Sequence, residues 1–193
     1  SQSKVWVGYF YENGIEIDKD LLLAKDYYGQ AAKKGNYEAM YSLGLLHEAN
    51  ASNRLKPRTL SNTEKNKMIS AIQALKRTGQ SFTNEETFNY INYGNPTGPI
   101  IDSEGSTAEY RTSITWFMKA AKGNHPQSFK KLADFYEKGL GVKQNYYKAY
   151  FNYLLAEHYG DEDSMFLAEL VGDYLSETEK KKALELIKKR ISQ

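Results

Sequence analysis

The chain has 193 residues, which is enough for one domain with a core of its own. Its 26 lysine and arginine residues nearly balance its 24 acidic residues, and the net charge of +2 with interspersed signs excludes a nucleic-acid-binding protein that relies on a broad basic stripe. The absence of cysteine excludes disulfides and thiolate metal sites, and no apolar run is long enough to span a bilayer as a helix.

A grid of small and aromatic residues recurs at a spacing of 36 residues. Val7-Gly8 is followed 36 positions later by Leu43-Gly44, and the same grid returns at Leu132-Ala133. A period between about 20 and 50 residues indicates stacked supersecondary units that bury their apolar faces against one another. We therefore predict a single repeat domain over 1–193, with repeats at about 4–38, 39–127 and 128–163 and a partial repeat at 164–175.

Each repeat is predicted to be a pair of helices joined by a glycine-containing turn. In the first repeat, residues 5–12 form a short helix, Gly14 ends it, and Asp20 accepts amide hydrogen bonds at the start of a second helix that runs to about residue 34. Small residues at the grid positions, such as Gly8 and Gly44, let neighbouring helices approach closely while Tyr and Trp side chains fill the remaining space.

The second repeat is interrupted between its two helices. The grid is lost after Asn50 and resumes at Trp116-Phe117, so about 53 extra residues form an insertion over about 51–106. Capping boxes, in which two side chains satisfy amides at a helix start, are expected at 61–64, 83–86 and 106–109. The first opens an amphipathic helix that ends at Gly79, and the last opens the delayed second helix of the repeat.

Two interpretations of this insertion are open. It is either a packed decoration that covers an exposed edge of the array or a contact element for a partner. In the second case the candidate contact residues are Phe88, Tyr90 and Tyr93.

The C-terminal residues predict a helix over 177–191 that caps the array. A capping box at 176–179 opens it, and its apolar face carries Ala183, Leu184, Ile187 and Ile191. Its two lysine-rich clusters lie on the outer face, as expected for the terminal helix of a solenoid.

The sequence offers no arrangement of residues that indicates an enzyme. The three histidines, His47, His125 and His158, are scattered and have no metal-ligand spacing. We predict no catalytic residues, no metal site and no cofactor. His47 takes the place of a core tyrosine in its repeat, so a packed or hydrogen-bonded histidine is expected there.

The first helices of the repeats carry the residues expected to bind a partner, because these helices line the inner surface of such arrays. Opposite the core positions lies a stripe that is aromatic or aliphatic with an acidic end in the first two repeats and charged in the third. Its members are Val5, Tyr9 and Glu12, then Tyr41, Leu45 and Glu48, then Lys130, Asp134 and Glu137. The 16 tyrosines of the chain suit a protein interface, although many of them are expected in the core.

These repeats resemble the Sel-one-like (Sel1-like) repeats, relatives of the tetratricopeptide repeats. Residues 133–142 (ADFYEKGLGV) carry the closest match, and residues 33–39 and 116–121 are similarly typical. The resemblance implies an all-α, right-handed α/α solenoid of helix–turn–helix repeats, here with a helical insertion and a C-terminal capping helix.

The resemblance also implies a non-enzymatic protein–protein interaction module that works as an adaptor or scaffold. Some bacterial proteins of this family are immunity proteins that neutralise toxin effectors of secretion systems, such as phospholipases, and a small array with one insertion suits that role. The alternative is the binding or hydrolysis of cell-wall-derived ligands. The expected partner is another protein, with no nucleic acid and no integral membrane segment; the oligomeric state and the compartment, a bacterial periplasm after leader removal or the cytoplasm, stay open.

Overall fold

The computed structural model describes residues 2–56, 61–83, 85–87 and 103–192, and all regular structure within these ranges is helical. The chain divides into two compact units. Unit 1 comprises Ser1–Ala51 and Thr107–Gln193, and unit 2 comprises Ser52–Ser106. The candidate contact residues Phe88, Tyr90 and Tyr93 lie outside the described residues.

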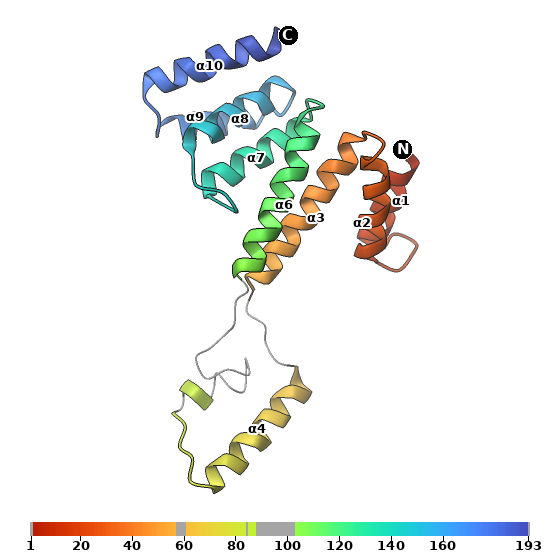
Figure 1. The fold of residues 1–193 in the computed structure, drawn as a ribbon, viewed down its shortest axis with the longest axis vertical. Coiled ribbons are helices and arrows are strands. Elements are labelled where there is room, and N and C mark those ends of the chain that lie inside the picture. Colours follow the sequence, from red (N-terminus) through yellow and green to blue (C-terminus); the bar gives the residue numbers. More distant parts are fainter. Residues whose placement is uncertain (1, 57–60, 84, 88–102, 193) are drawn as a thin grey trace. The chain divides into compact units, whose positions relative to one another are not determined.

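Unit 1 is an α-solenoid built from successive helix pairs (Figure 1). The pairs are α1 (Gln2–Asn13) with α2 (Leu21–Ala32), α3 (Tyr37–Arg54) with α6 (Ser103–Ala121), and α7 (Pro126–Lys138) with α8 (Tyr146–His158). They are followed by α9 (Ser164–Gly172) and α10 (Glu177–Ile191), which both pack against α8. The two helices of each of the three pairs are the two helices of one predicted repeat.

The turn of the first repeat follows the local chemistry of its residues. Gly14 ends α1 with a φ of +68°, a left-handed conformation that glycine adopts without steric cost. The Asp20 side chain accepts hydrogen bonds from the amides of Leu22 and Leu23 and so starts α2. Glu16, which takes the place of a turn glycine in this repeat, is also held at a positive φ of 60°. A residue with a side chain is strained there.

Small residues at the grid positions allow the two helices of a repeat to touch. A methyl group added at Gly8 would lie 2.8 Å from the Tyr28 ring, and one added at Gly44 would overlap the Phe117 ring. Both rings are buried almost completely. The predicted alternation of small and large residues is therefore confirmed at these two positions.

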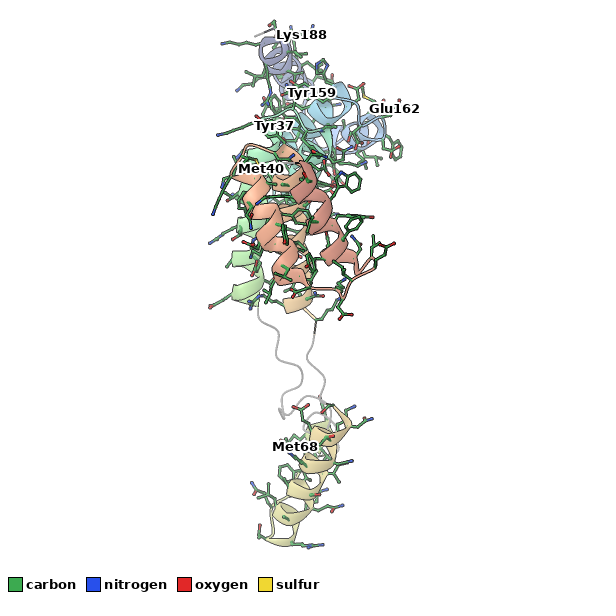
Figure 2. All side chains as sticks on the ribbon, turned by 90° about the vertical axis from the view of Figure 1, so that its right-hand side faces the viewer. Tyr37, Met40, Met68, Tyr159, Glu162 and Lys188 are labelled. Carbon is green, nitrogen blue, oxygen red and sulfur yellow. The ribbon has the colours of Figure 1, made fainter. Side chains whose placement is uncertain are left out.

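Two clusters of buried side chains form the core of unit 1. The first lies among α1, α2 and α3, and Met40 and Trp116 pack against its edge (Figure 2 labels Met40). The second is larger and joins α6, α7 and α8 to α9 and α10. In it, the Phe135 ring of α7 makes edge-to-face contacts with two rings of α6, those of Tyr110 and Phe117. Each repeat thus buries its apolar face against its neighbours.

Direct contacts between α3 and α6 join the two helices of the interrupted repeat. His47 Nδ1 lies 2.5 Å from a carboxylate oxygen of Glu109, and the buried hydroxyl of Ser113 donates to the carbonyl oxygen of Gly44 at 2.7 Å. Residues that are 62 and 69 positions apart in the sequence therefore hold the pair together. His47 is buried, as predicted from its core position.

The predicted capping box at 106–109 is wrong. Helix α6 begins at Ser103, so Ser106 lies inside the helix and its side chain is buried. Glu109 faces His47 instead of a helix terminus. The physical reason is the packing of α3 against α6. Ala51 on α3 is also fully buried, and both helices extend into the segment predicted as the insertion.

Unit 2 contains α4 (Asn62–Arg77), which carries Met68 in Figure 2. The predicted capping box at Ser61 and Glu64 is confirmed at its start, and Gly79 follows its end with a φ of +91°. A second capping box joins Thr83 and Glu86 through both expected hydrogen bonds, 2.8 and 3.1 Å long. Of the apolar residues on α4, Ile72 is buried and Leu75 is exposed.

The capping helix α10 begins as predicted, with the Ser176 and Glu179 capping box complete. Ala183 and Ile187 are buried against unit 1. Leu184 and Ile191, predicted on the same apolar face, are exposed, so that prediction is wrong for them. Only one edge of the predicted apolar face contacts the array.

Candidate functional site

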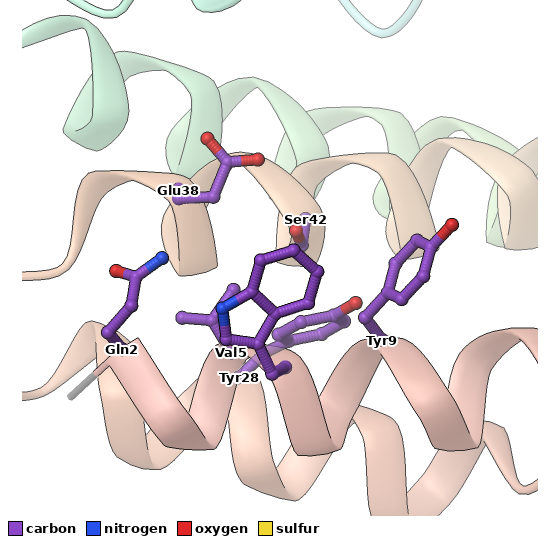
Figure 3. Close-up of a pocket in the computed structure, with 7 residues that line it drawn as sticks. Gln2, Val5, Tyr9, Tyr28, Glu38 and Ser42 are labelled. Carbon is purple, nitrogen blue, oxygen red and sulfur yellow. The ribbon is translucent and has the colours of Figure 1, made fainter. Parts of the chain in front are cut away.

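A groove runs along the face shared by the first helices of the first two repeats. It has a volume of about 490 Å³, in the range of ligand pockets. We call it the α1–α3 groove; Gln2, Val5, Trp6 and Tyr9 of α1 line it together with Tyr28 of α2 and with Glu38 and Ser42 of α3 (Figure 3). It lies entirely within unit 1.

Two aromatic side chains stand at the rim of the groove in contact with solvent. Trp6 is 56% exposed and Tyr9 is 44% exposed, and their rings meet edge to face with centroids 6.2 Å apart. Tyr9 was among the residues predicted to bind a partner. Trp6 was not predicted, although its position three residues before Tyr9 places both on one side of a helix.

Val5 does not belong to the exposed surface. It is only 7% exposed and is part of the core cluster formed by α1, α2 and α3. Its side chain contributes to the apolar base of the groove, beside Tyr28. The prediction that Val5 lies opposite the core is therefore corrected.

The acidic ends of the first and third predicted stripes are engaged inside their own repeats. The Tyr28 hydroxyl donates to a Glu12 carboxylate oxygen at 2.7 Å, and burial together with this hydrogen bond raises the pKa of Tyr28 well above its usual value. In the third repeat the Tyr153 hydroxyl lies 2.6 Å from carboxylate oxygens of both Asp134 and Glu137, and burial first and these carboxylates second raise its pKa likewise.

Tyr41 and Leu45, from the second stripe, are packed rather than free. The Tyr41 ring lies 5.6 Å from that of Phe117 and 4.8 Å from that of His125, measured between centroids. Leu45 is partly buried against the larger core cluster. Burial raises the pKa of Tyr41 to about 12, and the carboxylates of Glu48, Glu38, Asp161 and Asp134 add to that shift.

Ion pairs engage charged residues of the second and third stripes. Lys131 Nζ lies 2.9 Å from a Glu48 oxygen, and Lys130 Nζ lies 2.9 Å from an Asp161 oxygen. His125 Nε2 lies 3.0 Å from a Glu38 oxygen, and this hydrogen bond lowers the pKa of the Glu38 carboxyl. The stripe residues of α3 and α7 are therefore largely engaged in contacts within unit 1, and on α1 Tyr9 is the stripe residue that is exposed.

The described part of the chain offers little for catalysis or metal binding. Within it, no group of three or more His, Cys, Asp or Glu side chains could hold a metal ion. The three histidines lie apart, with His47 and His125 each facing a carboxylate and His158 exposed beside the Tyr159 ring. In the same ranges, no helix is long and apolar enough to cross a membrane.

A family model and one of two similar solved structures agree with this architecture. The model of the Sel1 repeat family matches residues 1–36 and 130–158, which are the first and third repeats. A Sel1 repeat protein from Oxalobacter formigenes has a similar structure, with a TM-score of 0.51 and 20% identity over 84% of this chain and 44% of that one. A protective antigen of uropathogenic Escherichia coli with an SLR fold matches at a TM-score of 0.40 and 16% identity, over 99% of this chain and 45% of that one.

The chain spans less than half the length of both solved structures, and no curated protein matches it. Sel1 repeats generally mediate protein–protein interactions. The 36-residue grid, the helix pairs and the two matched segments together show that the chain carries Sel1-like repeats.

Proposed function

We propose that this chain is a non-enzymatic protein-binding module and that the α1–α3 groove is its main contact surface. The observation that carries the proposal is the pair of exposed aromatic side chains, Trp6 and Tyr9, at the rim of a groove with an apolar base. Trp and Tyr dominate the energetics of protein interfaces, since each offers a large contact area with few rotatable bonds.

The remaining stripe residues support the groove. The bonds from Tyr28 to Glu12 and from Lys131 to Glu48 fix neighbouring helices relative to one another. A rigid groove loses less conformational entropy on binding than a mobile surface does.

A finer form of this proposal is an immunity protein that binds and neutralises a secreted toxin effector, such as a phospholipase. Unit 2, a compact insertion between the two helices of one repeat, supports a second contact element in addition to the groove. In this form unit 2 contacts the toxin at its active site, and the groove holds another part of the same protein.

The test is affinity capture from the native host with three chains. They are the unaltered chain, a chain with residues 55–104 replaced by a short turn, and a Trp6→Ala, Tyr9→Ala double variant. The matched control is Phe166→Ala, since Phe166 is 63% exposed at the equivalent helix position of α9 and lies outside the groove.

The proposal expects that the double variant loses its partner while its melting temperature and that of the control stay unchanged. Capture that survives in the double variant would contradict it. A toxin partner that is lost when residues 55–104 are replaced supports the immunity role.

A further inference from the structure

The seven residues that line the α1–α3 groove include one ionised side chain, and it is acidic. Glu38 stands among Val5, Trp6, Tyr9 and Tyr28, while Gln2 and Ser42 add neutral hydrogen-bonding groups. Because no lysine or arginine is among these described lining residues, an anionic ligand would meet a carboxylate without a compensating lysine or arginine charge from them.

The Glu38 carboxylate is available to a ligand. Its side chain is 53% exposed, and His125 binds only one of its two oxygens, Oε2, at 3.0 Å. The pKa of Glu38 is lowered by this hydrogen bond, so the group is an anion at neutral pH. The second oxygen can accept hydrogen bonds from a cation without breaking the contact with His125.

Negative charge also continues from the groove toward α7. Five carboxylates occupy this face against the ammonium groups of Lys130 and Lys131, and they are those of Glu38, Glu48, Asp134, Glu137 and Asp161. Burial raises the pKa of the partly buried Tyr41, and four of these carboxylates, all but that of Glu137, add to the shift. Because the two lysines pair with Glu48 and Asp161, a positively charged segment is favoured chiefly at the exposed Glu38 carboxylate.

From these observations, and resting on the proposed function, we infer that the groove binds a partner-protein segment that presents an arginine side chain. The apolar stem of the arginine packs against the rings of Trp6 and Tyr9, and its guanidinium group donates to the Glu38 carboxylate. A guanidinium group is planar and weakly hydrated, so it stacks on aromatic faces and pairs with carboxylates better than an ammonium group does. Arginine is thus preferred over lysine.

The experiment is a selection from a display library of linear peptides with the full chain as bait. Peptides are kept if they bind the unaltered chain and fail to bind the Trp6→Ala variant. A synthetic copy of the strongest binder is then compared with versions in which arginine is replaced by lysine, citrulline or glutamate, by fluorescence anisotropy.

The matched variants are Glu38→Gln, which keeps the shape and removes the charge, and Glu185→Gln, an exposed carboxylate on α10 away from the groove. Because Glu38→Gln removes a charge-assisted hydrogen bond, it should lower the affinity for the arginine peptide roughly tenfold or more. Glu185→Gln should change its affinity by less than about twofold. The citrulline and glutamate peptides should bind the unaltered chain much more weakly.

Selected peptides that lack basic residues, or an arginine peptide that binds Glu38→Gln as tightly as the unaltered chain, would overturn the inference and leave the proposed function standing. A selection in which no peptide distinguishes the Trp6→Ala variant would overturn both.

Discussion

The hydroxyl group of Tyr28 donates to the carboxylate of Glu12, and Tyr153 makes the equivalent bond to Glu137. In each pair the carboxylate lies 16 residues before the tyrosine, which places it near the end of the first helix and the tyrosine in the middle of the second. The interrupted repeat has Phe117 at the tyrosine position. Without a hydroxyl partner there, Glu48 forms an ion pair with Lys131 of the next repeat.

The first prediction concerns these hydroxyl–carboxylate bonds. Tyr28→Phe and Tyr153→Phe should each lower the free energy of unfolding by about 1.5–3 kcal/mol, because each removes a partly buried hydrogen bond to a charged group. Urea unfolding measures the change. Tyr27→Phe is the control, since the Tyr27 ring stacks on Tyr11 and its hydroxyl makes no hydrogen bond in the structure; less than about 0.5 kcal/mol is expected there. Equal losses of unfolding free energy in all three variants would show that the hydroxyl–carboxylate bonds do not stabilise the fold.

A second prediction concerns alkaline pH. Tyr41 has a pKa raised to about 12 in the folded chain, against about 10 when unfolded. Its contribution to stability is complete below pH 10 and falls between pH 10 and 12, because the unfolded state loses the phenolic proton first. Tyr28 and Tyr153, whose pKa values are also raised, act in the same direction.

The measurement for Tyr41 is the free energy of unfolding in urea at several pH values between 8 and 11.5. Above pH 10, the free energy of unfolding should fall more steeply for the unaltered chain than for the Tyr41→Phe variant, by about 1.4 kcal/mol per pH unit. Parallel pH profiles for the two proteins would show that Tyr41 titrates normally in the fold.

A third prediction uses glycines in different surroundings. Gly44→Ala and Gly8→Ala should lower stability by about 1–3 kcal/mol, since the new methyl groups meet the Phe117 and Tyr28 rings. Gly29→Ala on α2 meets no atom within 4 Å and should raise stability by about 0.5–1 kcal/mol through its better helix propensity. Thermal unfolding of the three variants checks the opposite signs. A stabilising Gly44→Ala would show that the helices can separate without cost.

The contact between His47 and Glu109 provides a fourth prediction. His47→Ala and Glu109→Ala should each destabilise the chain, and a double-mutant cycle should give a coupling energy of about 1–3 kcal/mol. His158→Ala, at an exposed position at the end of α8, is the control and should be nearly neutral. A coupling energy near zero would mean that this pair does not hold α3 against α6.

The fifth prediction is that unit 1 folds without unit 2. Its core clusters draw all their buried residues from Ser1–Ala51 and Thr107–Gln193. Replacing residues 55–104 with a short turn should therefore preserve cooperative unfolding and raise stability by about 2 kcal/mol through the lower entropy of closing a shorter loop. Circular dichroism during thermal unfolding measures this. Loss of the cooperative transition would show that the insertion is needed for the fold.

Much of the fold could be predicted from the sequence because its signals are local or periodic. The 36-residue grid defines the helix pairs, and the capping boxes that begin at Ser61, Thr83 and Ser176 depend on residues within one turn of a helix. The same kind of local signal failed at Ser106. There the pairing of α3 with α6 buries the serine and continues the helix past the apparent cap.

The candidate site was less predictable, because the role of each stripe residue depends on what lies opposite it. Glu12, Asp134 and Glu137 share the periodicity of a solvent-facing stripe, yet a tyrosine of the second helix reaches each of them. Val5 has the same periodicity and is buried. The sequence by itself determined which residues form helices and how the helices pair, through spacing and capping. Only the tertiary structure decided which stripe residues remain open, since burial depends on the approach of neighbouring helices, and it left Trp6 and Tyr9 exposed at the groove.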